Sequence, residues 1–305
     1  VLELARVLAG PWAGQILADL GADVIKVESP EGDGTRLWGP PWIERGNGER
    51  EAAYYHAANR GKRSIVADFK NEHDLARVRD LAASADVVLE NFKTGTLAKF
   101  GLDYASLTAA NQRLVYCSIT GFGQTGPRAH EAGYDFVVQA MSGFMALTGE
   151  PAGQPMKMGI SISDLTCGLY AVIGIQAALA MRERTGRGQH VDMALLDCSV
   201  GLLASQATHF FTTGENPPRM GNEHAQVSAY GVFPVADGEV VLAPANDGLF
   251  RRLLALLGRD DLLGDERFAS NESRLANRAE LDAMIADETR KWELTELLGA
   301  CGEAG

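Results

Sequence analysis

Asp164 is the residue of this chain whose position most strongly suggests chemistry. It follows the short stretch 159–163 and begins an apolar segment that predicts a long helix over residues 164–184. A carboxylate at a helix N-terminus lies near unpaired backbone N–H groups and the positive end of the helix dipole, which favour its ionised form at neutral pH. An ionised, partly desolvated carboxylate can attack an acyl group as a nucleophile. The alternative is that Asp164 only caps its helix.

Two further features could be taken for catalytic or binding motifs. Cys167 follows Asp164 by one helical turn, but no base is placed beside it, which favours a buried structural thiol. The glycine pattern at 121–126 matches GxGxxG after a predicted strand, but Pro127 and Arg128 follow it instead of an apolar helix. A dinucleotide fingerprint needs both flanks, so a structural turn is the favoured interpretation.

Basic and aromatic residues supply candidate ligand contacts. The segment 59–63 is basic, and lysines recur at Lys70, Lys93 and Lys99. Such a cluster at strand ends could receive a multiply charged phosphate, although a solvated surface position is the alternative for each lysine taken singly. Tyrosines could line a small pocket or belong to the core, namely Tyr54, Tyr55 and Tyr134.

The elements that must position these residues alternate along the chain. Strands are predicted at 1–8, 22–28, 63–69, 86–90, 114–119 and 189–196, with helices at 12–20, 71–84, 96–110 and 164–184. Such alternation is typical of an α/β fold with a mostly parallel sheet and helices on both faces.

The composition changes to that of a linker around residues 214–218. Beyond this point, segments 230–235 and 239–243 flank Asp237-Gly238 and predict a hairpin, and helical patterns follow at 249–257 and 278–291. We therefore predict a large domain over 1–213, a linker over 214–229 and a smaller α+β domain over 230–305.

The composition of the whole chain narrows the function classes. The 305 residues carry a formal net charge of −12, which argues against nucleic acid or an anionic membrane surface as the main partner. The four cysteines form no CxxC pair and the six histidines no HExxH motif, so no metal site is predicted and a reduced, cytoplasmic setting is favoured. The uncharged stretch 165–181 is short for a membrane span and predicts a buried core helix.

Several motifs together resemble the class III (CaiB/BaiF-type) coenzyme A transferases across essentially the whole chain. They are VLELARVLAGPWAG at 1–14, LGADVIKVE at 20–28, NRGKRS at 59–64, ENF at 90–92, SITGFGQTGP at 118–127, GYDF at 133–136, SDLTCGLYA at 163–171 and RTGRGQHVD at 184–192. The resemblance implies a Rossmann-like large domain, a smaller domain and an interlocked homodimer. It also implies that coenzyme A enters as a substrate, with no tightly bound cofactor.

The resemblance assigns roles to individual residues. The family nucleophile is the Asp of a D-x-x-x-G segment, which matches Asp164 with Gly168, and it forms an aspartyl-CoA thioester by way of a mixed anhydride. The CoA contacts carried over by position are Val7, Ala9, Lys70, Asn91, Phe92, Lys99 (where many members have Arg) and Leu195. Tyr54 and Tyr134 match residues beside the acyl-transfer site.

The substrates are less defined than the reaction class. The overall sequence, including RLWGPPW at 36–42, resembles family members that move CoA from succinyl-CoA to small dicarboxylates. Leu8 occupies a position at which oxalate-using members tend to have Gln. One alternative is an α-methylacyl-CoA racemase, whose members read G-H-D where this chain has Gly133-Tyr134-Asp135. A tyrosine, with an ordinary pKa of about 10, is a poor base at neutral pH. A nicotinamide-dependent dehydrogenase is the second alternative, disfavoured by the incomplete glycine fingerprint. Family members continue beyond the position of Gly305 and return to the large domain, so a further segment is expected there.

Overall fold

The computed structural model describes residues 1–46 and 48–305, whose contacts divide them into two compact units. The larger unit contains residues 1–146 and 156–217, and the smaller unit contains 147–155 and 218–305. The contacts therefore group residues 147–155 with the second unit. The domain boundaries that the sequence suggests stay a prediction.

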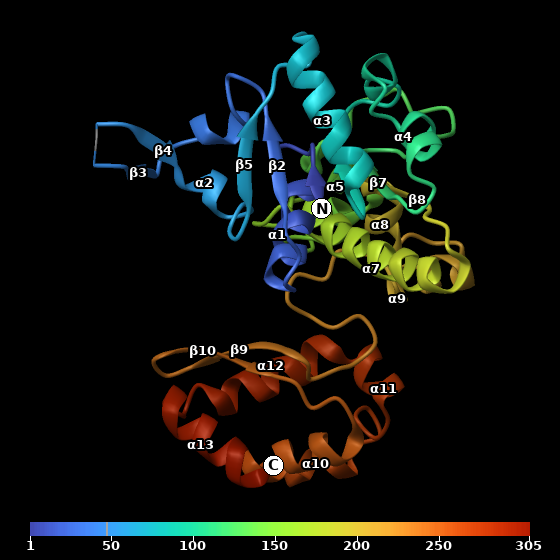
Figure 1. Ribbon diagram of the computed structural model, residues 1–305. Coiled ribbons are helices and arrows are strands. Elements are labelled where there is room, and N and C mark those ends of the chain that lie inside the picture. Colours follow the sequence, from blue (N-terminus) through green and yellow to red (C-terminus); the bar gives the residue numbers. More distant parts are fainter. Residues whose placement is uncertain (47) are drawn as a thin grey trace. The chain divides into compact units, whose positions relative to one another are not determined.

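A parallel six-stranded sheet forms the centre of the larger unit, which confirms the predicted α/β class (Figure 1). Its strands, in spatial order, are β5 (Arg63–Val66), β2 (Ile25–Glu28), β1 (Leu2–Glu3), β6 (Val87–Glu90), β7 (Val115–Thr120) and β8 (His190–Ala194). The chain first builds outward from β1 through β2 to β5 and then places β6 on the other side of β1. The order of the strands therefore reverses between β1 and β6.

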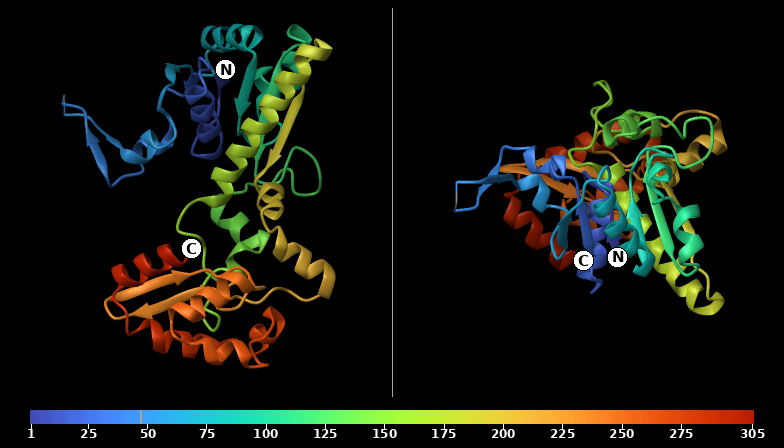
Figure 2. Two further views of the ribbon diagram at one scale, coloured as in Figure 1. Left: turned by 90° about the horizontal axis from the view of Figure 1, so that it is seen from below. Right: turned by 45° about the horizontal axis from the view of Figure 1, so that its top comes forward.

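Helices cover both faces of this sheet, because successive strand residues point to opposite faces and are apolar on each of them. In β6, Val87 and Leu89 belong to one core cluster, whereas Val88 belongs to another. The first cluster packs α1 (Ala9–Asp19) and α7 (Ile162–Thr185), and the second packs α3 (Glu72–Ser84) and α4 (Tyr104–Ala110). Figure 2 shows α7 running along the sheet beside β8. Strand side chains that alternate between two buried faces are what a parallel sheet requires.

The remaining elements of the larger unit are short. They include the hairpin β3 (Trp42–Glu44) and β4 (Arg50–Ala52), the helices α2 (Ala53–His56), α5 (Asp135–Ser142), α8 (Leu195–Gly201) and α9 (Ser205–Thr213), and α6 (Phe144–Leu147), which ends at the boundary between the units.

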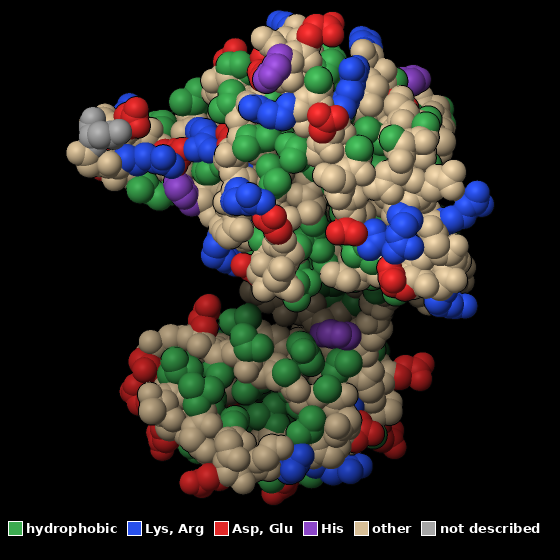
Figure 3. All heavy atoms as spheres, in the orientation of Figure 1, with side chains coloured by type: hydrophobic (Ala, Val, Ile, Leu, Met, Phe, Trp, Pro, Cys, Tyr) green, Lys and Arg blue, Asp and Glu red, His purple; other side chains and the backbone are tan. Residues whose placement is uncertain are grey.

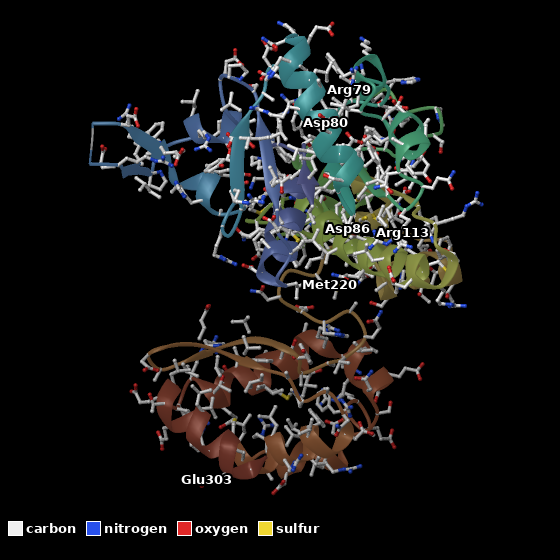
Figure 4. The ribbon with its side chains drawn as sticks, in the orientation of Figure 1. Arg79, Asp80, Asp86, Arg113, Met220 and Glu303 are labelled. Carbon is white, nitrogen blue, oxygen red and sulfur yellow. The ribbon has the colours of Figure 1, made fainter. Side chains whose placement is uncertain are left out.

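The predicted helix over 96–110 is wrong in one respect, because it is two separate elements. A 3₁₀ turn covers Leu97–Phe100, Gly101 follows with a left-handed φ of 62°, and α4 begins at Tyr104. A left-handed residue ends a helix, and glycine adopts that conformation without a steric penalty. Arg79 of α3, labelled in Figure 4, donates a hydrogen bond of 2.8 Å to the carbonyl of Phe100 and holds this break in place.

Helix α7 is long and apolar enough to cross a membrane by length and composition alone. One face, with Cys167, Ala171 and Ile175, is buried in the core beside α1, while Ile173 is exposed. A Cβ at Gly168 would lie 2.8 Å from the carbonyl oxygen of Ala9 in α1. The two helices therefore pack in direct backbone contact at this glycine.

The smaller unit contains the predicted hairpin, β9 (Gly231–Val235) paired antiparallel with β10 (Gly238–Leu242). Its helices are α10 (Asp247–Leu256), α11 (Asn271–Ala276), α12 (Arg278–Thr289) and α13 (Leu294–Ala304), with a 3₁₀ turn at Asp260–Gly264. Phe233, Phe250, Leu254 and Leu281 belong to the apolar core between hairpin and helices. Acidic side chains are spread over the face of this unit seen in Figure 3.

Candidate active site

A cavity of about 410 Å³ opens at the carboxyl ends of β1, β6 and β7. Residues 6–9 after β1, 91–94 after β6 and 119–121 at the end of β7 form much of its wall. Asp164 of α7, Leu195 of α8 and residues 131–134 complete it. In open α/β sheets, ligands bind at the carboxyl ends of the strands where the strand order reverses, which here is between β1 and β6.

Most of the site residues suggested by the sequence line this one cavity. They are Val7, Ala9, Asn91, Phe92, Tyr134, Asp164 and Leu195. Lys70 lines a neighbouring cavity of about 240 Å³, which shares Arg6 and Phe92 with the first. Lys99 is exposed on the 3₁₀ turn and lines neither cavity.

The start of α7 differs from the expectation and changes the environment of Asp164. The helix begins at Ile162 after Ser161, so Asp164 is its third residue and not its first. Ser161 makes no side-chain cap. Instead, the Oδ1 atom of Asp135 accepts hydrogen bonds from the backbone N–H groups of Ser163 at 2.9 Å and Asp164 at 3.4 Å. A carboxylate from α5 thus occupies the helix N-terminus that was expected to stabilise Asp164.

The expectation that the helix keeps Asp164 ionised at neutral pH is therefore wrong. Burial raises the pKa of Asp164 from 3.8 to about 7, and the negative charge of Asp135 contributes to the rise. Both effects disfavour the charged form of a carboxyl group. Near neutral pH the protonated and ionised forms of Asp164 are both populated. The ionised form is poorly solvated, which makes it a better nucleophile than an exposed aspartate.

Asp135 was not identified as a site residue from the sequence, although it lies in the GYDF motif. Its Oδ2 atom accepts a hydrogen bond of 2.7 Å from Gln139, and Gln139 accepts one of 2.9 Å from the backbone of Met158. These bonds tie α5 to the segment that leads into α7. Sequence periodicity cannot reveal a helix cap supplied by another helix, because capping patterns are read from neighbouring positions.

Two tyrosines lie close to Asp164 in different ways. The pKa of Tyr54 is raised by burial and, next, by the negative charge of Asp164, and its ring lies 5.2 Å from that of Trp38. Tyr134 lines the cavity and is 67% exposed. Tyr54 is therefore a fixed neighbour of the carboxylate, whereas the ring of Tyr134 is available to a ligand.

The glycine-rich loop at 121–126 is a structural turn, as the sequence favoured. A Cβ at Gly121 would lie 2.5 Å from the Cα of Gly133, and the reverse substitution meets the same obstacle. The loop after β7 therefore packs directly on the residue that precedes Tyr134, and both glycines line the cavity. Cys167 is buried, and a hydrogen bond with the Cys198 thiol together with burial raises its pKa, so this thiol is unreactive.

The basic segment 59–63 does not reach the cavity as a phosphate receptor. Arg60 and Arg63 form ion pairs on the surface with Asp19 and Asp23. The Lys62 side chain is 2% exposed and donates hydrogen bonds of 2.8 Å to the carbonyl of Pro11 and 3.0 Å to Glu3. Burial lowers the pKa of Lys62 to about 8.

Lys62 belongs to a buried ionic network at the carboxyl end of β1. Glu3 accepts from Lys62 and also from Lys26, whose Nζ atom lies 3.0 Å from Asp33. Asp33 in turn lines the cavity. The network therefore fixes the central strand and one wall of the cavity to each other.

A family model described as CoA-transferase family III matches residues 1–305. The chain belongs to this family. It is 58% identical over 303 residues to the succinate–glutarate CoA-transferase of Agrobacterium fabrum, covering 99% of this chain and 76% of that protein. It is 40% identical to the acetyl-CoA:oxalate CoA-transferase of Acetobacter aceti, covering 100% of this chain and 77% of the relative.

Solved structures show the same relationship. A CaiB/BaiF family protein from Brucella suis is 57% identical and superposes with a TM-score of 0.88, covering 100% of this chain and 80% of that one. The resemblance suggested by the motifs is confirmed, and the protein is a family III CoA-transferase whose substrates are CoA thioesters. The nicotinamide-dependent dehydrogenase is thereby excluded as its identity.

Proposed function

We propose that this enzyme moves CoA from succinyl-CoA to a small dicarboxylate through a thioester formed on Asp164. The observation that supports this most directly is the position of Asp164. Its carboxyl group, with a pKa of about 7, lies in the wall of the cavity at the carboxyl ends of β1, β6 and β7, where a thioester can reach it. Asp135 already caps the helix, so the capping alternative does not account for Asp164.

The chemistry needs a covalent carboxylate because a thiolate cannot displace the oxygen of a free carboxylate. The Asp164 carboxylate attacks the thioester carbonyl of succinyl-CoA, giving a succinyl-aspartyl anhydride and releasing CoA thiolate. The thiolate then attacks the aspartyl carbonyl, which releases succinate and forms the aspartyl-CoA thioester. The transfer of CoA from the succinyl group to Asp164 is thus divided into two acyl transfers.

The acceptor reverses these two steps. Its carboxylate attacks the aspartyl thioester, forming a second anhydride and again releasing CoA thiolate. The thiolate attacks the acceptor's carbonyl, giving the new acyl-CoA and regenerating the Asp164 carboxylate. No proton or cofactor is consumed, and exclusion of water protects both activated intermediates from hydrolysis.

The two neighbouring cavities suit the two ends of coenzyme A. We assign the thioester end to the cavity at Asp164, with Leu195, Val7 and Ala9 in its wall and Tyr54 and Tyr134 beside the reacting group. Lys70 lies in the second cavity with the aromatic rings of Phe69, Phe92 and Phe100, which suits a nucleotide base and phosphate. Lys99, although outside both cavities, is exposed and could reach a phosphate from the surface.

The choice of substrates rests on the relatives. The relative at 58% identity is named for succinate and glutarate, whereas the one at 40% is named for acetyl-CoA and oxalate. Leu8, which lines the cavity, stands where oxalate-using members tend to carry Gln. We therefore place succinyl-CoA as donor and glutarate, or a dicarboxylate of similar length, as acceptor.

We also propose that the enzyme is an interlocked homodimer that works in the cytoplasm. Large apolar side chains of the larger unit are exposed, among them Phe136, Val137, Ile173 and Phe211. Exposed apolar surface of this kind is typical of a face that a partner covers. Light scattering of the full-length protein tests this proposal, and a monomer at micromolar concentration would contradict it.

Trapping of the covalent intermediate tests the proposed function. The enzyme is incubated with succinyl-CoA, treated with hydroxylamine or borohydride, digested and examined by peptide mass analysis. We expect modification of the peptide containing Asp164, none in Asp164→Asn, and normal labelling in the control Asp86→Asn, whose side chain is 73% exposed. Modification at another residue would overturn the assignment. Activity with oxalate but not glutarate would overturn the acceptor, and solvent deuterium incorporation into a 2-methylacyl-CoA would indicate the racemase instead.

A further inference from the structure

Val7 has a backbone conformation that its side chain disfavours. Its φ angle is 70°, in the left-handed region, at the turn between β1 and α1. For a β-branched residue such a conformation is a genuine outlier, and strained residues of this kind persist only where the surroundings enforce them. Val7 lines the cavity, so the strain lies in the proposed binding wall.

The side chain of Asn91 supplies a restraint on this turn. Its Oδ1 atom accepts a hydrogen bond of 2.8 Å from the N–H group of Arg6, and its Nδ2 atom donates one of 2.6 Å to the carbonyl of Arg6. Both backbone groups of the residue before Val7 are thus bound by one amide. The pairing joins the segments that follow the adjacent strands β1 and β6.

Other contacts fix both sides of the same turn. Lys26 donates a hydrogen bond of 2.8 Å to the carbonyl of Ala5, and the N–H group of Trp12 donates one of 2.7 Å to the carbonyl of Leu8. Among the described residues, no protein group forms a hydrogen bond with the backbone N–H or carbonyl of Val7. The turn is therefore held at its neighbours and left unpaired at its centre.

We infer that Asn91 is a positioning residue that holds Val7 in its left-handed conformation, so that the unpaired backbone of Val7 is presented to the CoA substrate. This inference rests on the proposed function of the cavity. The amide oxygen and one N–H group of Asn91 bind Arg6, so this positioning role needs no direct contact between Asn91 and the nucleotide.

A double-mutant cycle between Asn91 and Val7 separates the two roles. Asn91→Ala lets the Val7 turn relax, and we expect the KM for succinyl-CoA to rise about 5- to 100-fold, the equivalent of the strain of one such residue, with a smaller change in kcat. Glycine adopts a positive φ without a steric penalty. In a Val7→Gly background the same Asn91→Ala substitution is therefore expected to raise KM by less than about threefold.

The outcome that overturns the inference is equally direct. If Asn91 binds the substrate through its own amide, Asn91→Ala raises KM by the same factor in both backgrounds. Asn111 provides the matched control, because its amide also binds backbone groups, of Ala83, Ala85 and Arg113, but it lines neither cavity. Asn111→Ala is expected to lower stability and leave KM unchanged. If Asn91→Ala does not fold, Asn91→Asp, which keeps the acceptor oxygen, takes its place in the cycle.

A measurement without substrate distinguishes this inference from the proposed function. Urea unfolding of the same four proteins measures the coupling between Asn91 and Val7 in the absence of any CoA thioester. Non-zero coupling with no CoA exchange by the wild type would support the restraint and reject the function. Additive effects on stability together with normal CoA exchange would reject the restraint alone.

Discussion

The substitution Asp135→Asn tests the electrostatic account of the nucleophile. The pKa of Asp164 is raised from 3.8 to about 7, with burial as the larger cause and the negative charge of Asp135 as the smaller. Removal of the Asp135 charge is therefore expected to lower the pKa of Asp164 by about 1 unit, which corresponds to about 1.4 kcal/mol. Asparagine keeps an oxygen that can accept from the backbone of Ser163, so the helix cap is retained.

The expected effect depends on pH. With a pKa of about 7, roughly a tenth of Asp164 is ionised at pH 6, and with a pKa of about 6 roughly half is ionised. The kcat/KM for succinyl-CoA should therefore rise about fivefold at pH 6 and remain nearly unchanged at pH 8. The assay is a profile of kcat/KM between pH 5 and 9, because its acidic limb reports the pKa of the free enzyme.

The control for this experiment is Asp135→Ala, which removes the charge and the helix cap together. We expect it to lower the free energy of unfolding by about 1 kcal/mol, whereas Asp135→Asn should lower it less. An acidic limb that stays in place in Asp135→Asn, or that moves to higher pH, would refute the reasoning.

Three further substitutions test the packing and charge of the larger unit. Because the folded-state pKa of Asp164 is raised, this carboxyl group favours folding at low pH, and the advantage is lost as the pH rises through about 7. Asp164→Asn should therefore raise the free energy of unfolding of the inactive protein by up to about 4 kcal/mol at pH 8, and by less at pH 5. Urea unfolding at both pH values measures the difference. Gly168→Ala should destabilise by about 1–3 kcal/mol, since its Cβ would lie 2.8 Å from the oxygen of Ala9. Gly201→Ala should not, because its Cβ would make only an ordinary contact, 4.0 Å from the hydroxyl oxygen of Tyr170. Glu3→Gln should destabilise the protein by about 3–5 kcal/mol, because the buried ammonium groups of Lys26 and Lys62 lose the carboxylate that they share. A decrease in Tm of less than about one degree would contradict this.

The sequence patterns predict the parallel sheet, the hairpin of the smaller unit and a long helix near whose start Asp164 lies, because each depends on local periodicity or on a short motif. The break at Gly101 also depends on neighbouring residues, but the sequence does not predict it. A single glycine inside an apolar pattern can adopt either a helical or a left-handed conformation, so its presence does not show that a helix ends there.

The contacts that control the site depend on residues far apart in the chain. Asp135 caps a helix that begins 27 residues later, at Ile162, and Asn91 binds the backbone of Arg6 across a separation of 85 residues. The raised pKa of Asp164 follows from burial and, to a smaller extent, from the negative charge of Asp135. Such pairings arise only when the strands are brought side by side, and for that reason no pattern in one segment predicts them.

The central place of β1 has a consequence for the order in which the protein forms during synthesis. The strand Leu2–Glu3 is made well before β6, one of its two neighbours, which begins only at Val87. Until the ribosome has released Val87–Glu90, Glu3 and its two lysines lack the cover of that neighbour. Contacts of such high sequence separation slow folding and prolong the exposure of unpaired strand edges. We expect the nascent chain to depend on chaperones most strongly in this interval.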